Sequence, residues 1–488
     1  MSKPNHKQVF LFSIINYIGI GIGIISTLFI YPKNKELLGI FRYVESLAQT
    51  VFPVLLFGAS QALINFNPKL DDDLKKNLFS FSLFSIIVKS VIVLSIILFL
   101  SFIPVFSGMK YIYFAFVIAV FLAFIELFKK QSTILEKIAV PTFFDNIIPK
   151  LALPFIFLLL LSHKISTNAP LILYCVIYGF IFLCIGCYLF IKFKPSFSIS
   201  NAYLFSAIQR SDYYKFSLFA FAGSLGSVFA FRIDSLLIPK LINMTANGTF
   251  SIGVTLASAL AIPATGLFVL YAPIISNHLK KNDLISLNRD YKATAKFLFF
   301  IGATLYSCIF LGIENLFLLL PTHENLVDSI PIILILGANV VINMATGFNG
   351  EIITYSKFYN FNLKAILLLI VLNVTLILVF VKFFNFGIVG VAFSSLLSMV
   401  FFNLAKLIFI YQKMKLFPFD KSFVKLIVVF LSTLVLVYFL PKTNNVFVDL
   451  VCKCCLSLLL NLGIIYKLKL VYQFNFQIDK LVLRYIKT

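Results

Sequence analysis

The chain has 488 residues, of which 60% are hydrophobic and 12% are charged. Soluble globular proteins have about 45–50% apolar and about 25% charged residues, so this composition excludes a chain built from soluble domains. The net charge of +22 comes from basic residues that stand singly or in small groups between apolar runs. This scatter excludes a nucleic-acid-binding domain, in which basic residues gather on one face or along one helix.

Apolar runs long enough to cross a bilayer follow one another along the whole chain. A spanning segment needs about 20 apolar residues, and it must be helical because the hydrocarbon offers its backbone no hydrogen-bond partner. We therefore predict an all-α membrane protein with about 14 transmembrane helices. The predicted spans lie near residues 9–31, 42–66, 78–103, 111–128, 143–162, 171–191, 216–239, 248–275, 297–320, 329–355, 362–383, 387–411, 424–440 and 446–466.

The distribution of lysine and arginine predicts the orientation of these spans. Most of the 41 Lys and Arg residues fall on the side that both termini share, and cytoplasmic connections are the ones that carry such an excess. We therefore expect both termini in the cytoplasm. The connection 277–296 carries Leu284, Leu287 and Tyr291 on one helical face, which fits either an amphipathic helix on the inner leaflet or a solvated connector.

Two segments far apart in the chain repeat one pattern. Gly39 and Phe41 in the second predicted span recur as Gly248 and Phe250 in the eighth, at an offset of 209 residues. Parallel six-helix repeats are one known plan of transporters. We therefore expect two pseudo-symmetric six-helix bundles, followed by two additional transmembrane helices and a cytoplasmic tail. Their predicted ranges are 1–195, 196–415 and 416–488.

No sequence motif for enzymatic chemistry is present. The chain has no Walker A sequence, no HExxH pair and no nucleophile elbow, so we expect no catalytic residues, no metal site and no cofactor. Gly19, Gly21 and Gly23 imitate the start of a dinucleotide fingerprint, but they lie in an apolar run and favour close helix packing. The seven cysteines also lie in apolar runs, where free cysteine behaves as a small hydrophobe. The sequence therefore predicts a transporter rather than an enzyme.

The candidate substrate-binding residues are four basic residues within predicted spans: Arg42, Lys89, Lys150 and Arg232. A charged side chain at the bilayer centre costs about 2.5–3.5 kcal/mol or more, so such residues usually face a water-filled cavity. A positive cavity suits an anionic head group, because guanidinium and ammonium groups bind phosphate. The alternative is structural ion pairing, since Arg42 and Glu45 are three residues apart on one helix.

Six acidic residues within the predicted spans are possible partners of these four cations. They are Glu45, Glu126, Asp145, Asp234, Glu314 and Glu351. Asp234 lies only two residues from Arg232 and therefore points to a different face of the helix. We consider Asp234 and Glu45 as candidates for binding a coupling ion, because transport without an ATP site needs an ion gradient or the gradient of the substrate itself.

Three stretches of the chain carry a family likeness. They are 38–43 running to Pro53 and 58–59; 232–238 followed by 247–253; and 348–351 to Lys357 followed by 386–392. Together with the length, the fourteen spans and the paired halves, they resemble the Wzx-type polysaccharide flippases, a branch of the multidrug/oligosaccharidyl-lipid/polysaccharide (MOP) flippase superfamily. The resemblance covers nearly the whole chain, although its motifs are loose and mostly apolar.

The resemblance implies a V-shaped pair of six-helix bundles in which spans 1, 2, 7 and 8 border a central cavity. It implies a flippase of the bacterial cytoplasmic (inner) membrane that moves a lipid-linked oligosaccharide of the undecaprenyl diphosphate type by alternating access, for O-antigen, capsule or exopolysaccharide synthesis. Arg42 and Arg232 then fall on cavity-lining helices, whereas Lys89 does not. The expected partners are that substrate and membrane lipids, with other polysaccharide-assembly membrane proteins as further candidates and no nucleic acid.

Other functions stay open on the sequence alone. A cation-coupled small-molecule or drug antiporter of the same superfamily shares the fold but usually has twelve spans. A polysaccharide polymerase or ligase also has many spans, but it generally carries a large periplasmic loop, and the outside connections predicted here are short. Within the flippases, export of the peptidoglycan precursor is a further alternative.

Overall fold

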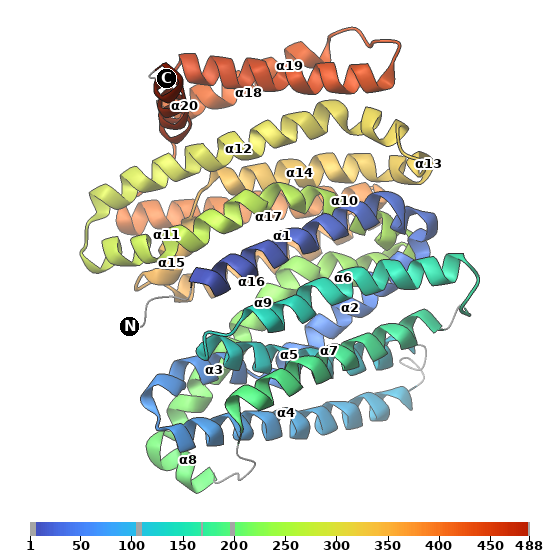
Figure 1. The fold of residues 1–488 in the computed structure, drawn as a ribbon, viewed down its shortest axis with the longest axis vertical. Coiled ribbons are helices and arrows are strands. Elements are labelled where there is room, and N and C mark those ends of the chain that lie inside the picture. Colours follow the sequence, from blue (N-terminus) through green and yellow to red (C-terminus); the bar gives the residue numbers. More distant parts are fainter. Residues whose placement is uncertain (1–5, 104–109, 167–168, 196–200, 487–488) are drawn as a thin grey trace. The chain divides into compact units, whose positions relative to one another are not determined.

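The computed structural model describes residues 6–103, 110–166, 169–195 and 201–486, and all regular elements within these ranges are helices (Figure 1). Among them, eleven helices are long and apolar enough to cross a membrane, and the number reaches thirteen if each of two bent helix pairs counts as one span. The predicted all-α membrane class is confirmed, whereas the exact number of fourteen spans stays a prediction. The chain forms two compact units, Met1–Gly248 and Thr249–Thr488. The predicted domain boundary after residue 195 adjoins residues 196–200, which lie outside the described ranges.

The first unit is built around α2, which packs against α5 and α9, while α1 and α7 pack against α6. Its helices are α1 (His6–Phe29), η1 (Tyr31–Asn34), α2 (Lys35–Leu56), α3 (Ala59–Phe66), η2 (Asn67–Lys69), α4 (Asp72–Ser101), α5 (Lys110–Ile134), α6 (Ala139–Leu161), α7 (Ala169–Phe193), α8 (Asn201–Ala207), α9 (Arg210–Leu241) and the start of α10 (Met244–Ser258).

The second unit is built around α12, which packs against α14, α18 and α19, while α17 packs against α14 and α16. Its helices are η4 (Ala259–Ala261), α11 (Ile262–Lys280), α12 (Leu284–Leu318), α13 (His323–Leu326), η5 (Val327–Ser329), α14 (Ile330–Ala345), α15 (Asn349–Tyr355), α16 (Asn360–Leu378), η6 (Val379–Phe383), α17 (Gly387–Met414), α18 (Lys421–Tyr438), α19 (Val446–Lys467) and α20 (Tyr472–Ile486).

The apolar surface of α4 is suited to lipid rather than to water. Val91 is 59% exposed and Phe99 is 70% exposed. Seven further apolar side chains of this helix are also exposed: Phe84, Ile87, Val88, Ile92, Leu94, Ile96 and Leu98. A contiguous apolar surface of this size is rare on a soluble monomer. The residues therefore gain their apolar surroundings from the bilayer.

The starts of α2 and α10 are matched structurally as well as in sequence. Asn34 caps α2 by accepting a hydrogen bond from the Leu37 N–H at 3.0 Å, and Asn243 accepts one from the Ala246 N–H at 2.7 Å. Asn243 follows Asn34 by the same 209 residues that separate the repeated glycines. An asparagine side chain at this position satisfies one of the unpaired N–H groups of the first helical turn. The repeat therefore extends to the local hydrogen bonding.

These two helix starts also cross at backbone contact. A Cβ atom on Gly39 would lie 1.8 Å from the Met244 carbonyl oxygen, and a Cβ atom on Gly248 would lie 1.8 Å from the Lys35 carbonyl oxygen. The contact is reciprocal, since each glycine meets the carbonyl of the residue four positions before its counterpart. Asn247 adds a hydrogen bond from its Nδ2 atom to the Gly39 carbonyl at 2.8 Å. Only glycine permits this approach.

The span that contains α2 is broken near its centre. Pro53 inside α2 lacks a backbone N–H, and the helix ends at Phe57 and Gly58, whose φ angles are 45° and 73°. A Cβ atom on Gly58 would also lie 2.2 Å from the Ser217 carbonyl oxygen of α9. The break redirects the chain into α3, which packs on α5 and α9.

The connection 277–296 is neither a surface helix nor a free linker. Its first residues complete α11, and its last thirteen form the first turns of α12. Leu287 and Tyr291 are fully buried against Phe348, Ile352 and Leu407 of the same unit. The apolar face was correctly recognised, but it packs on protein instead of lipid, because α12 runs on without interruption into its membrane-spanning part.

Candidate functional site

The centre of the candidate site is an ion pair on α2. The Nη1 atom of Arg42 donates a hydrogen bond to Glu45 Oε2 at 2.8 Å, and the Tyr174 hydroxyl of α7 donates to Glu45 Oε1. The spacing of three residues brings Arg42 and Glu45 onto one face of the helix. The Arg42 and Glu45 side chains are 24% and 12% exposed, and Tyr174 is fully buried. Glu45 therefore accepts from two directions and is fixed in place.

Arg232 is the second guanidinium of this group. It lies on α9, which packs against α2, directly after a 51° bend that separates Arg210–Ala230 from Arg232–Leu241. Arg232 lies within electrostatic range of both Glu45 and Arg42. Among the residues that the structure describes, no carboxylate forms a direct ion pair with it. One carboxylate is therefore shared by two guanidinium groups.

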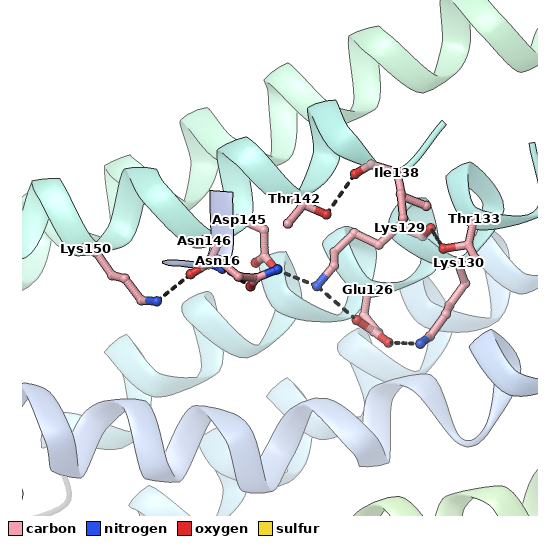
Figure 2. A network of polar contacts seen from close by, with 10 residues as sticks. All are labelled: Asn16, Glu126, Lys129, Lys130, Thr133, Ile138, Thr142, Asp145, Asn146 and Lys150. Atoms are coloured by element: carbon pink, nitrogen blue, oxygen red, sulfur yellow. Dashed lines mark hydrogen bonds and ion pairs between the residues drawn. The ribbon is translucent and has the colours of Figure 1, made fainter. Parts of the chain in front are cut away.

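Lys150 extends the positive group along α6. Its Nζ atom donates a hydrogen bond to Asn146 Oδ1 at 2.5 Å, and Asn146 Nδ2 donates to Asn16 Oδ1 of α1 (Figure 2). Lys150 lies within electrostatic range of Arg42 and Asp145. Its direct partner is a neutral amide, so its charge is not neutralised by direct pairing with a carboxylate.

Asp145 instead belongs to a separate network of ion pairs between α5 and α6. Its Oδ2 atom accepts a hydrogen bond from Lys129 Nζ at 2.5 Å (Figure 2). Glu126 lies 3.7 Å from Lys129 Nζ and 3.1 Å from Lys130 Nζ. Two carboxylates and two ammonium groups balance one another here. The network ties the ends of α5 and α6 together and leaves Lys150 outside it.

Lys89, the deepest predicted lysine, supports the break in α2. Its Nζ atom donates to the Leu56 carbonyl at 3.5 Å and lies 5.4 Å from the centroid of the Phe57 ring. Leu56 is the last residue of α2, so its carbonyl has no partner within the helix. The structure thus places Lys89 at a helix end and brings it to neither Arg42 nor Arg232 by any direct bond.

The predicted residues therefore divide into groups. Arg42, Glu45, Arg232 and, at longer range, Lys150 belong together. Asp145 also lies within electrostatic range of Lys150, but its direct bond is to Lys129. Lys89 has its own partner. Asp234 is half-buried on α9, and its expected role in ion coupling, like that of Glu45, stays a prediction.

Sequence reasoning missed two buried lysines of the second unit. Lys406 of α17 is 7% exposed, and its Nζ atom lies 4.0 Å from the centroid of the Phe402 ring. Lys453 of α19 is 8% exposed and pairs with Asp449 at 3.0 Å. Both residues stand inside predicted spans, 387–411 and 446–466, and this position was the available signal.

Tyr174 was also missed. A tyrosine near the end of the sixth predicted span reads as an interfacial anchor. Its hydroxyl is instead buried and bonded to Glu45. The signal was its position, since Tyr174 and Arg42 both lie near the predicted outer ends of their spans.

The comparison with known proteins bears on the fold. No protein-family model and no curated protein matches the chain. A solved structure of the lipid II flippase MurJ in an inward closed conformation matches with a TM-score of 0.70 at 16% identity, covering 94% of this chain and 99% of that chain. An inward-facing multidrug resistance MATE family transporter of the MOP superfamily matches with a TM-score of 0.63 at 14% identity, covering 83% of this chain and 94% of that chain.

An outward-facing MATE family transporter of the same superfamily matches with a TM-score of 0.55 at 12% identity, covering 84% of this chain and 96% of that chain. Identities this low support the architecture and no more. The chain therefore has the fold shared by a lipid II flippase and by multidrug transporters of the MOP superfamily.

Proposed function

We propose that the chain is a flippase of the MOP superfamily that moves a lipid-linked oligosaccharide across the bacterial inner membrane. The observation that carries this proposal is the excess of positive charge inside the first unit. Arg42, Lys150 and Arg232 are three cations in apolar helices, and Glu45 is the one carboxylate that directly pairs with any of them among the described residues. A purely structural ion-pair network would be closer to neutral, as the cluster around Lys129 is.

A prenyl diphosphate is the substrate class that this charge pattern suits best. A diphosphate brings several negative oxygens, and an arginine guanidinium can donate two parallel hydrogen bonds to a phosphate while lysine acts as a point charge. In surroundings of low polarity these interactions are stronger than in water. The prenyl chain stays in the lipid, and the sugar-bearing head group passes through the protein.

The setting and direction of transport are expectations from the sequence. The excess of basic residues predicts cytoplasmic termini. The resemblance to Wzx-type flippases implies that the substrate moves from the inner leaflet to the outer one. The oligosaccharide then serves O-antigen, capsule or exopolysaccharide assembly, in which other membrane proteins of that pathway act before and after this step. No step of this scheme requires a cofactor.

The second candidate function is a cation-coupled antiporter of small molecules. It is favoured by the similarity to MATE transporter structures and by the fixed carboxylate of Glu45. An antiporter of cationic drugs needs acidic groups to hold its substrate. The positive balance around Glu45 therefore favours the anionic substrate.

The test is the distribution of lipid-linked oligosaccharide between the two leaflets in a deletion strain. We expect complete repeat units to accumulate on the cytoplasmic face, and their mass identifies the substrate. Complementation with Arg232→Ala should restore export poorly, whereas Arg289→Ala, which removes a 77% exposed arginine, should restore it fully. A normal lipid distribution combined with altered sensitivity to cationic drugs would favour the antiporter instead.

A further inference from the structure

Gly19 of α1 provides the space in which the Lys150 ammonium lies. A Cβ atom on Gly19 would lie 2.9 Å from Asn146 Oδ1, 3.0 Å from Lys150 Nζ and 3.3 Å from Lys150 Cδ. Asn16, which holds Asn146 in place, stands three residues earlier on the same helix and therefore near the same face (Figure 2). One face of α1 thus contacts the side chains of Asn146 and Lys150 of α6.

The other two glycines of the triplet have no such neighbour. Cβ atoms on Gly21 and Gly23 would meet nothing within 4 Å among the described parts of the chain. Close helix packing, which the sequence suggested for all three glycines, is therefore not their common role. The requirement for glycine is specific to the position that faces Lys150.

The atoms near Gly19 are the ends of flexible side chains. A methyl group there would move Lys150 Nζ and Asn146 Oδ1 aside without pressing on backbone, in contrast to Gly39, where the obstacle is a carbonyl group. Replacing glycine by alanine inside a helix also stabilises the helix, because alanine loses less conformational freedom on folding. Gly19→Ala therefore changes the position of one ammonium group and leaves the fold intact.

We propose that Gly19 is a positioning residue, which seats the Lys150 ammonium so that it binds the phosphate of the lipid-linked substrate. The proposal rests on the proposed function. It is supported by the bonding of Lys150, whose direct partner is a neutral amide. An ammonium group has three donors, so Lys150 keeps donors for an anion after bonding to Asn146.

The experiment measures the binding of farnesyl diphosphate, with farnesol and inorganic pyrophosphate as comparison probes, to the purified full-length chain in nanodiscs. Four variants are compared with the wild type: Gly19→Ala, Lys150→Ala, the double variant and Gly21→Ala. We expect Gly19→Ala and Lys150→Ala each to weaken farnesyl diphosphate binding about ten-fold, which is the effect of losing about 1.4 kcal/mol. Farnesol binding by Gly19→Ala should stay unchanged. The unfolding temperature of this variant should stay unchanged or rise slightly.

The double variant separates a positioning role from other effects. If Gly19 acts through Lys150, Gly19→Ala has no further effect in the Lys150→Ala background, and Gly21→Ala binds as the wild type does. Normal binding by Gly19→Ala, or an equal additional loss in the double variant, would overturn this inference and leave the proposed function standing. A wild-type chain that binds farnesyl diphosphate no better than farnesol would overturn the proposed function and the inference together.

Discussion

Single basic residues in the first unit differ in what neutralises them. Arg42 is directly paired with Glu45, Lys129 with Asp145, and Lys150 only with an amide. The three-residue spacing of Arg42 and Glu45 offered their pairing as an alternative, and the structure contains this pair. The contacts of Tyr174 with Glu45 and of Asn16 with Asn146 could not be predicted, because these partners are more than a hundred residues apart in the chain.

One charged residue outside the spans has a structural role that pH should reveal. Burial acts to raise the pKa of Asp420, but hydrogen bonds from Ser422, Lys296 and the Phe423 N–H outweigh it and lower the pKa below its ordinary value. A lowered pKa means that the stabilisation is complete above the pKa of the unfolded chain and is lost as the pH falls through the folded value. Asp420 also caps α18.

We therefore expect Asp420→Ala to lower the free energy of unfolding by about 1 kcal/mol at pH 7, the usual loss for an N-cap residue. The difference from the wild type should shrink as the pH falls below the ordinary carboxyl pKa of about 4 towards the lowered pKa of the folded state, because the unfolded chain takes up its proton first. Thermal unfolding followed by circular dichroism at several pH values measures both effects. A difference that stays constant down to pH 3 would show that the charge of Asp420 contributes nothing.

Among the helices, α2 and α10 carry the tightest contact. The crossing at Gly39 and Gly248 joins backbone to backbone, so an added methyl group has no side chain to push away. The repeated sequence predicted that these glycines correspond. It did not predict that they meet, because periodicity relates positions in the chain and says nothing of contacts between them.

We expect Gly39→Ala and Gly248→Ala each to lower the amount of folded protein strongly, through overpacking that typically costs about 1–3 kcal/mol or more. The double variant should be less damaging than the sum of the two, because both substitutions open the same crossing. The yield of monodisperse protein in detergent and its unfolding temperature are the measurements. Gly23→Ala, on an open helix face, is the matched control and should behave as the wild type.

Helix α19 is bonded to α12 through a buried carboxylate that also forms an ion pair within α19. Asp449 of α19 accepts hydrogen bonds from Lys453 Nζ at 3.0 Å and from Asn315 Nδ2 of α12 at 2.7 Å. The Thr443 N–H donates to its other oxygen at 3.0 Å. With Asp449 only 3% exposed, the carboxylate depends on these donors for its charge.

Lys453→Met should therefore destabilise the protein by roughly 3–5 kcal/mol, the usual cost of leaving one buried charge without its partner. Adding Asp449→Asn should recover much of this loss, because the amide carries no charge and keeps an oxygen for Asn315. Unfolding temperatures of the two variants test this expectation. If Lys453→Met is tolerated and the added Asp449→Asn makes it worse, the pair is not the anchor of α19.

For the whole molecule, the sequence alone predicts the structural class but only part of the detailed architecture. Mean composition and long apolar runs are sufficient for an all-α membrane fold, since the bilayer leaves a continuous apolar segment no other structure. The number and limits of the spans are harder. α1 and α2 form a pair bent by 55°, and α9 bends beside Arg232, so hydropathy alone cannot decide where one span ends. The burial of Lys406 was not predicted for a similar reason, because a lysine near the end of a span can either be buried or extend its side chain to water.

The predicted topology can be tested with cysteine labelling. After replacement of the seven native cysteines, single cysteines at Lys164 and Lys442 should react with a membrane-impermeant reagent added outside, whereas those at Lys137 and Lys413 should react only after permeabilisation. All four positions are exposed in the structure, so burial does not mask them. The opposite labelling pattern would show that the predicted orientation, with both termini in the cytoplasm, is wrong.

The crossing of the capped helix starts also relates the two copies of the repeat by symmetry. Asn34, Lys35 and Gly39 meet Asn243, Met244 and Gly248 as two copies of one surface would, each glycine against the corresponding carbonyl. That is the geometry of a two-fold symmetric homodimer interface. In such a symmetric contact the same requirement for glycine occurs twice, once in each copy of the repeat, and neither position can supply the space that the other needs.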